Sequence, residues 1–402
     1  MSRPRRQAPA PTVKAGRIWT GFAATLIGLG LGVAIVVEAI AERGPLRAGL
    51  RLRPDSARLL AKDAELALAA GERERAADLA ARALRNTPFT VRALRVLGLT
   101  IDQKGDSGRA DSVITTAGNW SLRDGPAHLW LYHRRAVTGD FGGALAHADI
   151  VMRRREDLRT PISRTLAAAA AVEPRTWRPI ARRLDSRPNW RGAFLAALLE
   201  EPGGRAASAA LALALEGREG AYRPPEQAAL FQALVRGRQF QVLGRLRSGL
   251  VTREPLLDGG FERKDGGPPF AWSLRQAAGS SAQIVAADGG RVLETSWDGR
   301  SPVPVARQLL VLSPGAYVLS GRVWTNRPAA GAPLGWSLAC ADGPRFLVPE
   351  AAPQAGGWRR FSVSFQVPAQ DCDAQWLHLY GAGAAGGSGV TRYDDLAIEA
   401  VR

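Results

Sequence analysis

Aromatic and hydrogen-bonding side chains alternate with aliphatic ones in two segments of the C-terminal third of the chain. Residues 375–380 read Gln-Trp-Leu-His-Leu-Tyr, and residues 317–324 read Tyr-Val-Leu-Ser-Gly-Arg-Val-Trp. Every second side chain of an extended strand lies on the same face, so we expect the rings and polar groups to share one solvent-facing surface. Aromatic rings stack on the C–H faces of sugars while polar neighbours bind the hydroxyl groups. The predicted sugar-binding residues are Arg322, Trp324, Trp376, His378 and Tyr380. Rings in these positions also fit a sandwich core, or a contact that docks this face on another part of the chain.

Residues for catalysis are sparse. The chain has four histidines, and none has zinc-ligand spacing or a nucleophile motif around it; they are His128, His133, His147 and His378. We therefore expect a protein that is not an enzyme. Paired carboxylates for glycoside hydrolysis are not excluded by spacing alone, so a glycan-processing enzyme stays an alternative.

The elements that carry the aromatic residues belong to a β-rich domain. From Pro255 to Arg402 the chain fills with Gly, Pro and segments of period two, such as residues 361–367 (Phe-Ser-Val-Ser-Phe-Gln-Val). Several short strands of this kind predict an all-β sandwich or jelly roll. The two cysteines of the chain, Cys340 and Cys372, both lie in this domain. We expect them to form a disulfide, which would stabilise the fold by roughly 3 to 4 kcal/mol; two buried thiols are the alternative.

Two segments at the ends of this domain carry a family resemblance. It opens with Leu256-Leu257-Asp258-Gly259-Gly260-Phe261-Glu262 and closes with Tyr393-Asp394-Asp395-Leu396-Ala397-Ile398-Glu399, with Pro269-Phe270-Ala271-Trp272 between them. Residues 255–402 thereby resemble the carbohydrate-binding-module jelly rolls of the galactose-binding-like type. The resemblance implies glycan binding and a structural calcium ion held by Glu262 and Asp395, for which carboxylate oxygens are suited. The alternative is that both are ordinary surface carboxylates and that the chain has no cofactor.

A second pattern precedes the β-rich domain and repeats every 34 residues. Gly71, Gly105 and Gly139 keep this spacing, since 105 − 71 and 139 − 105 both equal 34. Alanines follow five residues later, at positions 76, 110 and 144. Such a period indicates a two-helix unit that buries its apolar face only by stacking on its neighbours.

This array, residues 45–250, resembles the tetratricopeptide family, with Gly98 at the small position of the first helix and Pro88 closing the first copy. Beyond the third copy, we expect degenerate helices at residues 161–171, 175–184, 190–200, 205–215 and 225–250. The resemblance implies a concave groove that binds protein partners. Its predicted exposed contact residues are Arg92, Arg95, Asp102, Tyr132 and Arg135.

The N-terminal segment predicts a membrane anchor. Residues 1–17 carry five basic residues and no acid, and residues 18–37 carry no charge. Twenty helical residues reach about 30 Å, the thickness of a bilayer core, and basic residues stay on the cytoplasmic side. We expect a cytoplasmic tail (1–17), a transmembrane helix (18–37) in the inner membrane, and a periplasmic remainder. A cleaved signal peptide is the alternative, because Ala39-Ile40-Ala41 has the form of a cleavage site.

The net charge of +17 does not indicate nucleic-acid binding. Only four of the 54 basic residues are lysines, which leaves 50 arginines spread over the whole chain without a recognised reading motif. The combined prediction is a multidomain, membrane-anchored periplasmic scaffold for cell-surface or exopolysaccharide assembly, with envelope proteins and a polysaccharide as partners. The chain's oligomeric state does not follow from the sequence. A protein-only adaptor whose sandwich binds no sugar remains the other alternative.

Overall fold

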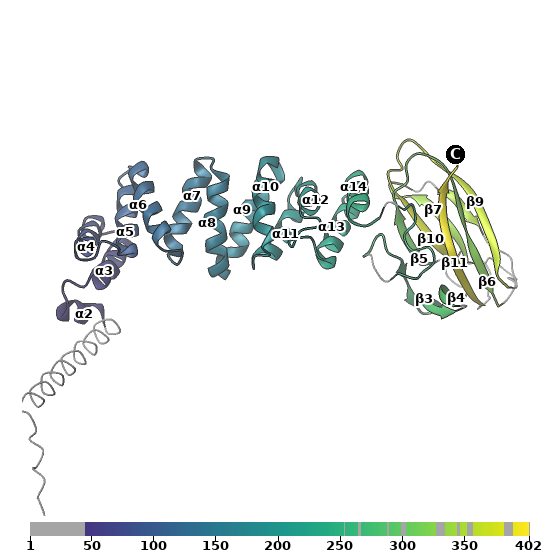
Figure 1. The fold of residues 1–402 in the computed structure, drawn as a ribbon, viewed down its shortest axis with the longest axis horizontal. Helices are drawn as coiled ribbons and strands as arrows, with labels where there is room; N and C mark the ends of the chain where they lie inside the picture. The colour runs from purple at the N-terminus through teal and green to yellow at the C-terminus, as the bar shows by residue number, and fades with distance from the viewer. Residues whose placement is uncertain are drawn as a thin grey trace, which may run out of the picture. The chain divides into compact units, whose positions relative to one another are not determined.

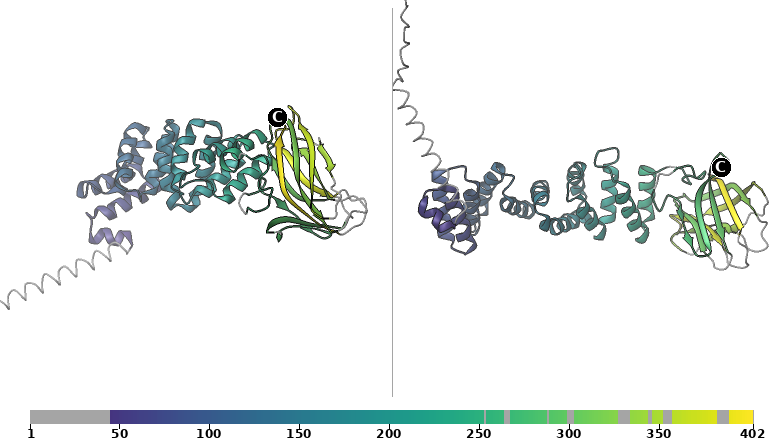
Figure 2. Two further views of the ribbon diagram at one scale, coloured as in Figure 1. Left: turned by 45° about the vertical axis from the view of Figure 1, so that its right-hand side comes forward. Right: turned by 90° about the horizontal axis from the view of Figure 1, so that it is seen from below.

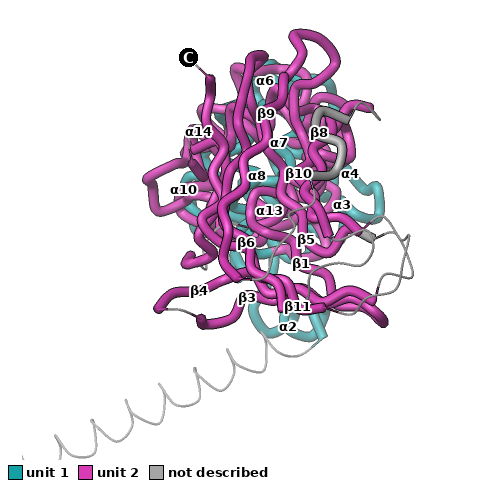
Figure 3. Tube along the Cα trace, turned by 90° about the vertical axis from the view of Figure 1, so that its right-hand side faces the viewer, with its two compact units in different colours: residues 1–154 teal, residues 155–402 magenta. Residues whose placement is uncertain are grey.

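The computed structural model of the chain describes residues 45–252, 254–263, 267–287, 289–298, 303–326, 334–343, 346–351, 357–381 and 389–401. The predicted tail (1–17) and membrane span (18–37) lie outside these residues. None of the helices within the described ranges is both long and apolar enough to cross a bilayer. The chain divides into two compact units, Met1–Arg154 and Arg155–Arg402, which are coloured separately in Figure 3 and described one at a time.

The first unit consists of helices that repeat with the period of the sequence pattern. After α2 (Leu46–Leu52) come three pairs: α3 (Ala57–Ala69) with α4 (Arg73–Asn86), α5 (Val91–Asp102) with α6 (Ser107–Trp120), and α7 (Gly125–Val137) with α8 (Phe141–Arg154). The first helices of the pairs begin at 57, 91 and 125, and the second at 73, 107 and 141, so both series advance by 34 residues. The helical repeat predicted from the glycine spacing is therefore present in this unit.

The recurring small residues have two structural roles. Gly71, Gly105 and Gly139 lie in the turns between paired helices, where their φ angles are 81°, 92° and 77°, a region that favours glycine. Gly98 serves close packing instead, since a Cβ atom there would overlap Cγ1 of the buried Ile114. The repeat thus needs glycine at the turns for the backbone conformation, and at position 98 for the close contact between α5 and α6.

The second unit begins with further helices, shown from blue to green in Figures 1 and 2. Their bounds are η1 (Glu156–Leu158), α9 (Arg159–Val172), η2 (Pro174–Thr176), α10 (Trp177–Asp185), α11 (Arg191–Glu200), α12 (Gly204–Ala214), α13 (Pro224–Arg236) and α14 (Phe240–Leu250). The prediction of one helix over residues 225–250 is wrong, because the chain turns between α13 and α14. Arg238 adopts a φ of 53° there, two residues before α14, the position that glycine occupies in the earlier pairs.

The strands of the second unit form two antiparallel sheets, as the period-two segments predict. The five-stranded sheet has the order β1 (Ser273–Leu274), β5 (Val303–Leu310), β10 (Gln375–Gly381), β7 (Leu334–Cys340), β8 (Phe346–Ala351). The six-stranded sheet has the order β2 (Gln276–Ala277), β3 (Ser280–Ala287), β4 (Gly290–Trp297), β11 (Gly389–Ala400), β6 (Gly315–Thr325), β9 (Arg359–Val367). Strands adjacent in space are mostly distant in sequence, so the register of each face depends on the whole domain.

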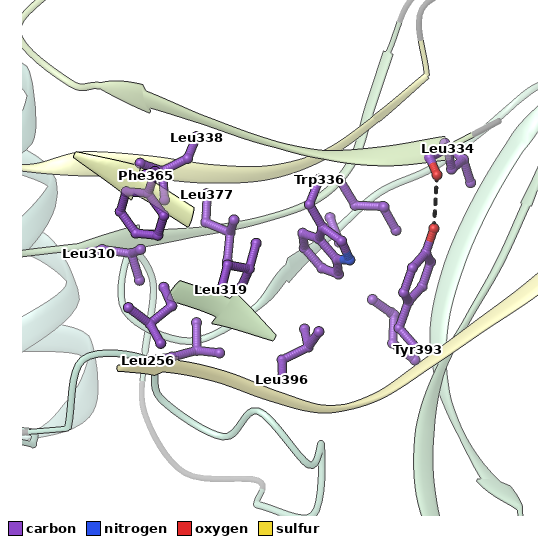
Figure 4. Packing of buried hydrophobic residues seen from close by; sticks show 14 of the residues in the cluster. Leu256, Leu310, Leu319, Leu334, Trp336, Leu338, Phe365, Leu377, Tyr393 and Leu396 are labelled. Carbon is purple, nitrogen blue, oxygen red and sulfur yellow. Dashed lines mark hydrogen bonds between the residues drawn. The ribbon is translucent and has the colours of Figure 1, made fainter. Parts of the chain in front are cut away.

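Apolar side chains from both sheets meet in one core, part of which is drawn in Figure 4. Trp336 and Tyr393 are fully buried, with ring centres 5.2 Å apart, and the Tyr393 hydroxyl donates to the Leu334 carbonyl at 2.9 Å. Trp272 packs against this core and Trp297 belongs to it, so three of the domain's six tryptophans have structural roles. Cys340 and Cys372 form a disulfide bond at the edge of the same core.

The segment before β1 connects the helices of the second unit to the sandwich. Phe270 is fully buried, its ring centre lies 5.2 Å from that of Phe231 on α13, and the Arg247 guanidinium of α14 lies 5.6 Å from it. Arg247 also donates to the carbonyl oxygens of Glu254 and Pro255. These contacts bury Phe270 rather than any of the five predicted sugar-binding residues.

Candidate functional site

The five predicted sugar-binding residues lie on two different sheets. Arg322 and Trp324 are on β6 of the six-stranded sheet, whereas Trp376, His378 and Tyr380 are on β10 of the five-stranded sheet. Along both strands partly exposed residues alternate with buried ones, and all five side chains point away from the core, as the pattern predicts. The outer faces of two packed sheets point in opposite directions. The expectation of one shared surface is therefore wrong, and the sandwich has two separate candidate faces.

On the six-stranded sheet, the arginines that cover the tryptophans are held by carboxylates of the same face. The Arg392 guanidinium lies 4.9 Å from the Trp324 ring centre and pairs with Glu294 at 2.8 Å. The Arg322 guanidinium lies 5.1 Å from the Trp358 ring centre and pairs with Asp394 at 2.5 Å and Asp395 at 2.7 Å. Cross-strand contacts of this kind stabilise a sheet. Carboxylates of the protein balance the charges of these two arginines, so their contacts with the tryptophans are explained by the stability of the sheet.

On the five-stranded sheet, a row of polar residues crosses four strands beside the aromatic residues. In the strand register, Arg307 of β5 lies opposite Ser273 of β1 on one side and His378 of β10 on the other. His378 in turn lies opposite Ser337 of β7. Residues directly opposite each other in a sheet place their side chains on the same face. The sheet therefore brings two hydroxyl groups, a guanidinium and an imidazole into one line.

Two aromatic side chains flank this row on β10. The rings of Trp376 and His378 are nearly parallel, at 14°, with centres 6.0 Å apart, and the Arg307 guanidinium lies 5.0 Å from the Trp376 ring centre. Tyr380 lies beyond His378, opposite Pro304. Trp376, His378 and Tyr380 are each partly exposed, so both ring surfaces and polar atoms are presented on this face.

The polar side chains of this face differ in exposure: Arg307 is exposed, Ser273 and His378 are partly exposed, and Ser337 is only 7% exposed. Among the described residues, the side chains of Ser273, Arg307, Ser337, His378 and Tyr380 have no hydrogen-bond or ion-pair partner. Burial lowers the pKa of His378 below its usual range, and the nearby Arg307 charge lowers it further. This lowered pKa favours the neutral imidazole, in which one ring nitrogen can donate and the other can accept.

A pocket of about 450 Å³ adjoins the row at Arg307. It is lined by Ser273, Leu274, Arg275, Gln276, Pro304 and Arg307. Its volume falls within the range of small-ligand sites. Pocket, row and rings together form a single polar and aromatic surface, which we name the β10 face, defined by Ser273, Arg275, Arg307, Ser337, Trp376, His378 and Tyr380.

The two carboxylates predicted to bind calcium each have a protein partner. Glu262 accepts a hydrogen bond from the Arg291 backbone N–H at 2.6 Å, and Asp395 pairs with Arg322 at 2.7 Å. Within the described ranges, no group of three or more His, Cys, Asp or Glu residues is placed to hold a metal ion. Calcium at Asp395 would have to displace a guanidinium, and the calcium prediction remains a prediction.

The residues predicted to line the repeat groove mainly contact other repeats. Arg95 and Tyr132 are only 5% exposed, so the expectation that they are exposed is wrong. Arg95 pairs with Glu65 at 2.6 Å and Asp124 at 2.8 Å, and thereby joins three successive helix pairs. Arg92 is exposed as predicted, and Asp102 and Arg135 are partly exposed. All three also have partners: Arg92 pairs with Glu65 at 3.3 Å, Asp102 accepts from the Trp130 indole at 2.9 Å, and Arg135 pairs with Asp111 at 2.6 Å.

Sequence reasoning missed the arginines of the β10 face. Residues 303–310 read Val-Pro-Val-Ala-Arg-Gln-Leu-Leu, a segment with no clear alternation. Arg307 is exposed on that strand, while Gln308 is buried and holds the Leu257 backbone through two hydrogen bonds of 2.9 Å. The two residues next to Arg307 in the sequence, Ala306 and Gln308, are both buried. No local pattern therefore distinguished Arg307 from the other 49 arginines.

Comparison with known proteins finds similarity to solved structures only at low TM-scores. No protein-family model matches the sequence, and no curated protein matches it. Among solved structures, the chain is similar to the CBM22-1 xylan-binding domain from Paenibacillus barcinonensis Xyn10C, with 15% identity and a TM-score of 0.27 over 36% of this chain and 92% of that chain. It is similar to a CBM4 module, with 14% identity and a TM-score of 0.29 over 38% and 99%. It is also similar to TmCBM61 in complex with beta-1,4-galactotriose, with 12% identity and a TM-score of 0.28 over 37% and 100%. Each of these matches therefore covers little more than a third of this chain.

Proposed function

We propose that the chain is a non-enzymatic scaffold of the bacterial envelope that binds a polysaccharide on its β10 face. The observation that carries this proposal is the polar row Ser273–Arg307–His378, whose side chains have no hydrogen-bond or ion-pair partner among the described residues, beside the partly exposed rings of Trp376 and Tyr380. Polar groups left without protein partners on a rigid sheet can bind hydroxyl groups without rearrangement, and the rings can stack on sugar C–H faces.

The helical repeats and the N-terminal segment have separate roles in this scaffold. We assign protein binding to the tetratricopeptide-like helical repeats, and attachment to the inner membrane to residues 18–37 with the bulk of the chain in the periplasm. The partners would be envelope or polysaccharide-assembly proteins. The 34-residue advance of the helix starts supports the repeat assignment, and the charge distribution of residues 1–37 supports the orientation.

The glycan proposal is tested by binding of the detergent-solubilised full chain to purified envelope polysaccharides. Trp376→Ala should weaken binding by about 1 to 3 kcal/mol, the range for losing a large apolar contact. Trp324→Ala is the matched control, because its ring lies on the opposite sheet under Arg392, and it should leave affinity unchanged. Melting temperatures of both variants show whether each remains folded.

The effects of the two variants show which sheet binds the polysaccharide. If Trp324→Ala weakens binding and Trp376→Ala does not, the six-stranded sheet carries the site. If no polysaccharide binds the unmodified chain, the protein-only adaptor is the better description.

A further inference from the structure

We propose that the polymer bound on the β10 face is acidic, a polysaccharide that carries carboxylate groups recognised by Arg275 and Arg307. This inference rests on the proposed function and adds the class of ligand to it. The pocket beside the polar row is lined by these two arginines and by the uncharged Ser273, Leu274, Gln276 and Pro304. Both arginines are exposed, and within the described part of the chain neither has an ion-pair partner.

The opposite sheet supplies an internal comparison. Arg322 and Arg392 also stack on tryptophans, yet each is paired with carboxylates of its own face, at distances of 2.5 to 2.8 Å. Arg307 makes the same kind of contact with Trp376, at 5.0 Å, without a described carboxylate beside it. Among the described residues, the domain therefore balances the charges of its stacked arginines on one face and leaves the charge of Arg307 unbalanced on the other.

The stacked geometry suits a carboxylate ligand. A guanidinium lying over a ring keeps its N–H groups in its own plane, where they can bind a carboxylate with two parallel hydrogen bonds. A sugar acid presents an apolar C–H face for Trp376 and a carboxylate for Arg307 on the same ring. A neutral sugar would leave both guanidinium charges unmatched, whereas a lipid phosphate would match them and offer no such face to the ring.

The test compares two polymers that differ only in charge, polygalacturonate and its methyl ester. The detergent-solubilised full chain should bind polygalacturonate, with an affinity that falls as salt is added, and bind the methyl ester at least about tenfold more weakly, as expected for a lost charged contact. Arg307→Gln and Arg275→Gln should each reduce affinity for polygalacturonate about tenfold. Arg360→Gln, an exposed residue on the six-stranded sheet, removes the same charge and should have no effect.

Different failures separate the two proposals. Equal binding of the acid and the ester, weakened only by Trp376→Ala, overturns the acidic ligand and leaves the glycan proposal intact. Binding to neutral envelope polysaccharides but not to polygalacturonate has the same meaning. Binding to vesicles of anionic phospholipid that depends on Arg275 and Arg307, without binding to either polymer, replaces the polysaccharide with a membrane surface. Absence of binding to every polysaccharide overturns both proposals.

Discussion

Two histidines, His128 on α7 and His147 on α8, form a hydrogen-bonded pair between the two helices. The Nδ1 atoms of His128 and His147 are 3.0 Å apart, and Nε2 of the buried His128 lies 3.2 Å from the Ser121 carbonyl oxygen at the end of α6. A carbonyl oxygen only accepts, so Nε2 of His128 carries the proton and its Nδ1 is the acceptor. His147 therefore donates from its own Nδ1, and the pair is neutral.

This pair should make the first unit sensitive to acid. Burial lowers the pKa of His147 to about 4, helped by the nearby His128 and Arg135 and opposed by Asp140 and Asp111. Burial also lowers the pKa of His128. A folded-state pKa below the unfolded value means that stability is fully present above about pH 6.5 and is lost as the pH falls toward 4. Since His147 is partly exposed, solvent screening limits the loss to roughly 1 to 2 kcal/mol.

Thermal unfolding of the full chain between pH 7 and 4 checks this expectation. His147→Gln keeps a neutral donor for His128 without a titrating group, so it should reduce the acid loss of the melting temperature. His133→Gln, an exposed neighbour on α7, is the control and should behave like the unmodified chain. An acid loss that is the same in all three proteins would assign it to other groups.

Ion pairing in the repeats shows why some residues were placed wrongly. The partners of Arg95 lie 30 and 29 residues away, close to one repeat length. A helix-face argument treats one helix at a time, so it assigned Arg95 to solvent. The pair partners belong to the neighbouring repeats, and only the stacked array brings them together.

At the scale of single elements, strand alternation was a sound guide to which side of a strand faces the core. It predicted that Leu377 and Leu379 would be buried and that Trp376 and His378 would point outward, and the structure confirms this. Alternation carries no information about which sheet a strand joins. The orders β5–β10–β7 and β11–β6–β9 depend on pairings between distant segments, and for this reason Trp324 and Trp376 were wrongly placed on one surface.

The contact between α5 and α6 predicts opposite effects for two glycines. Gly98→Ala would place a methyl group against the buried Ile114, and overpacking of this kind costs about 1 to 3 kcal/mol. A methyl group at Gly108, the second residue of α6, meets only Asp106 Oδ1 at 3.9 Å, so Gly108→Ala should raise stability by about 0.4 to 1 kcal/mol, because alanine reduces the freedom of the unfolded chain. Melting temperatures of the full chain with each substitution give the comparison. A rise with both would mean that close packing does not explain glycine at position 98.

At the scale of the whole molecule, the change from a helical to a strand period is the strongest sequence signal. The last helix ends at Leu250 and the first strand begins at Ser273, which agrees with the change of composition near Pro255. The division of the chain between Arg154 and Arg155 had no such signal. It falls between α8 and η1, within a stretch where the 34-residue spacing of helix starts continues from α7 at Gly125 to α9 at Arg159.

Orientation in the membrane is the prediction on which the glycan proposal depends most. Five basic residues precede the uncharged segment 18–37, and basic residues are retained on the cytoplasmic side. A reporter that is active only in the periplasm should therefore be active when fused after Leu250, and a cytoplasmic reporter at the same position should be inactive. Replacing Arg3, Arg5 and Arg6 with Glu removes most of the charge bias and should reduce the difference between the two reporters, whereas the same change at the exposed Arg51 and Arg53, beyond the span, should not. A cytoplasmic reporter that is active after Leu250 would place the β10 face away from any envelope polysaccharide, because a bilayer would then separate the two.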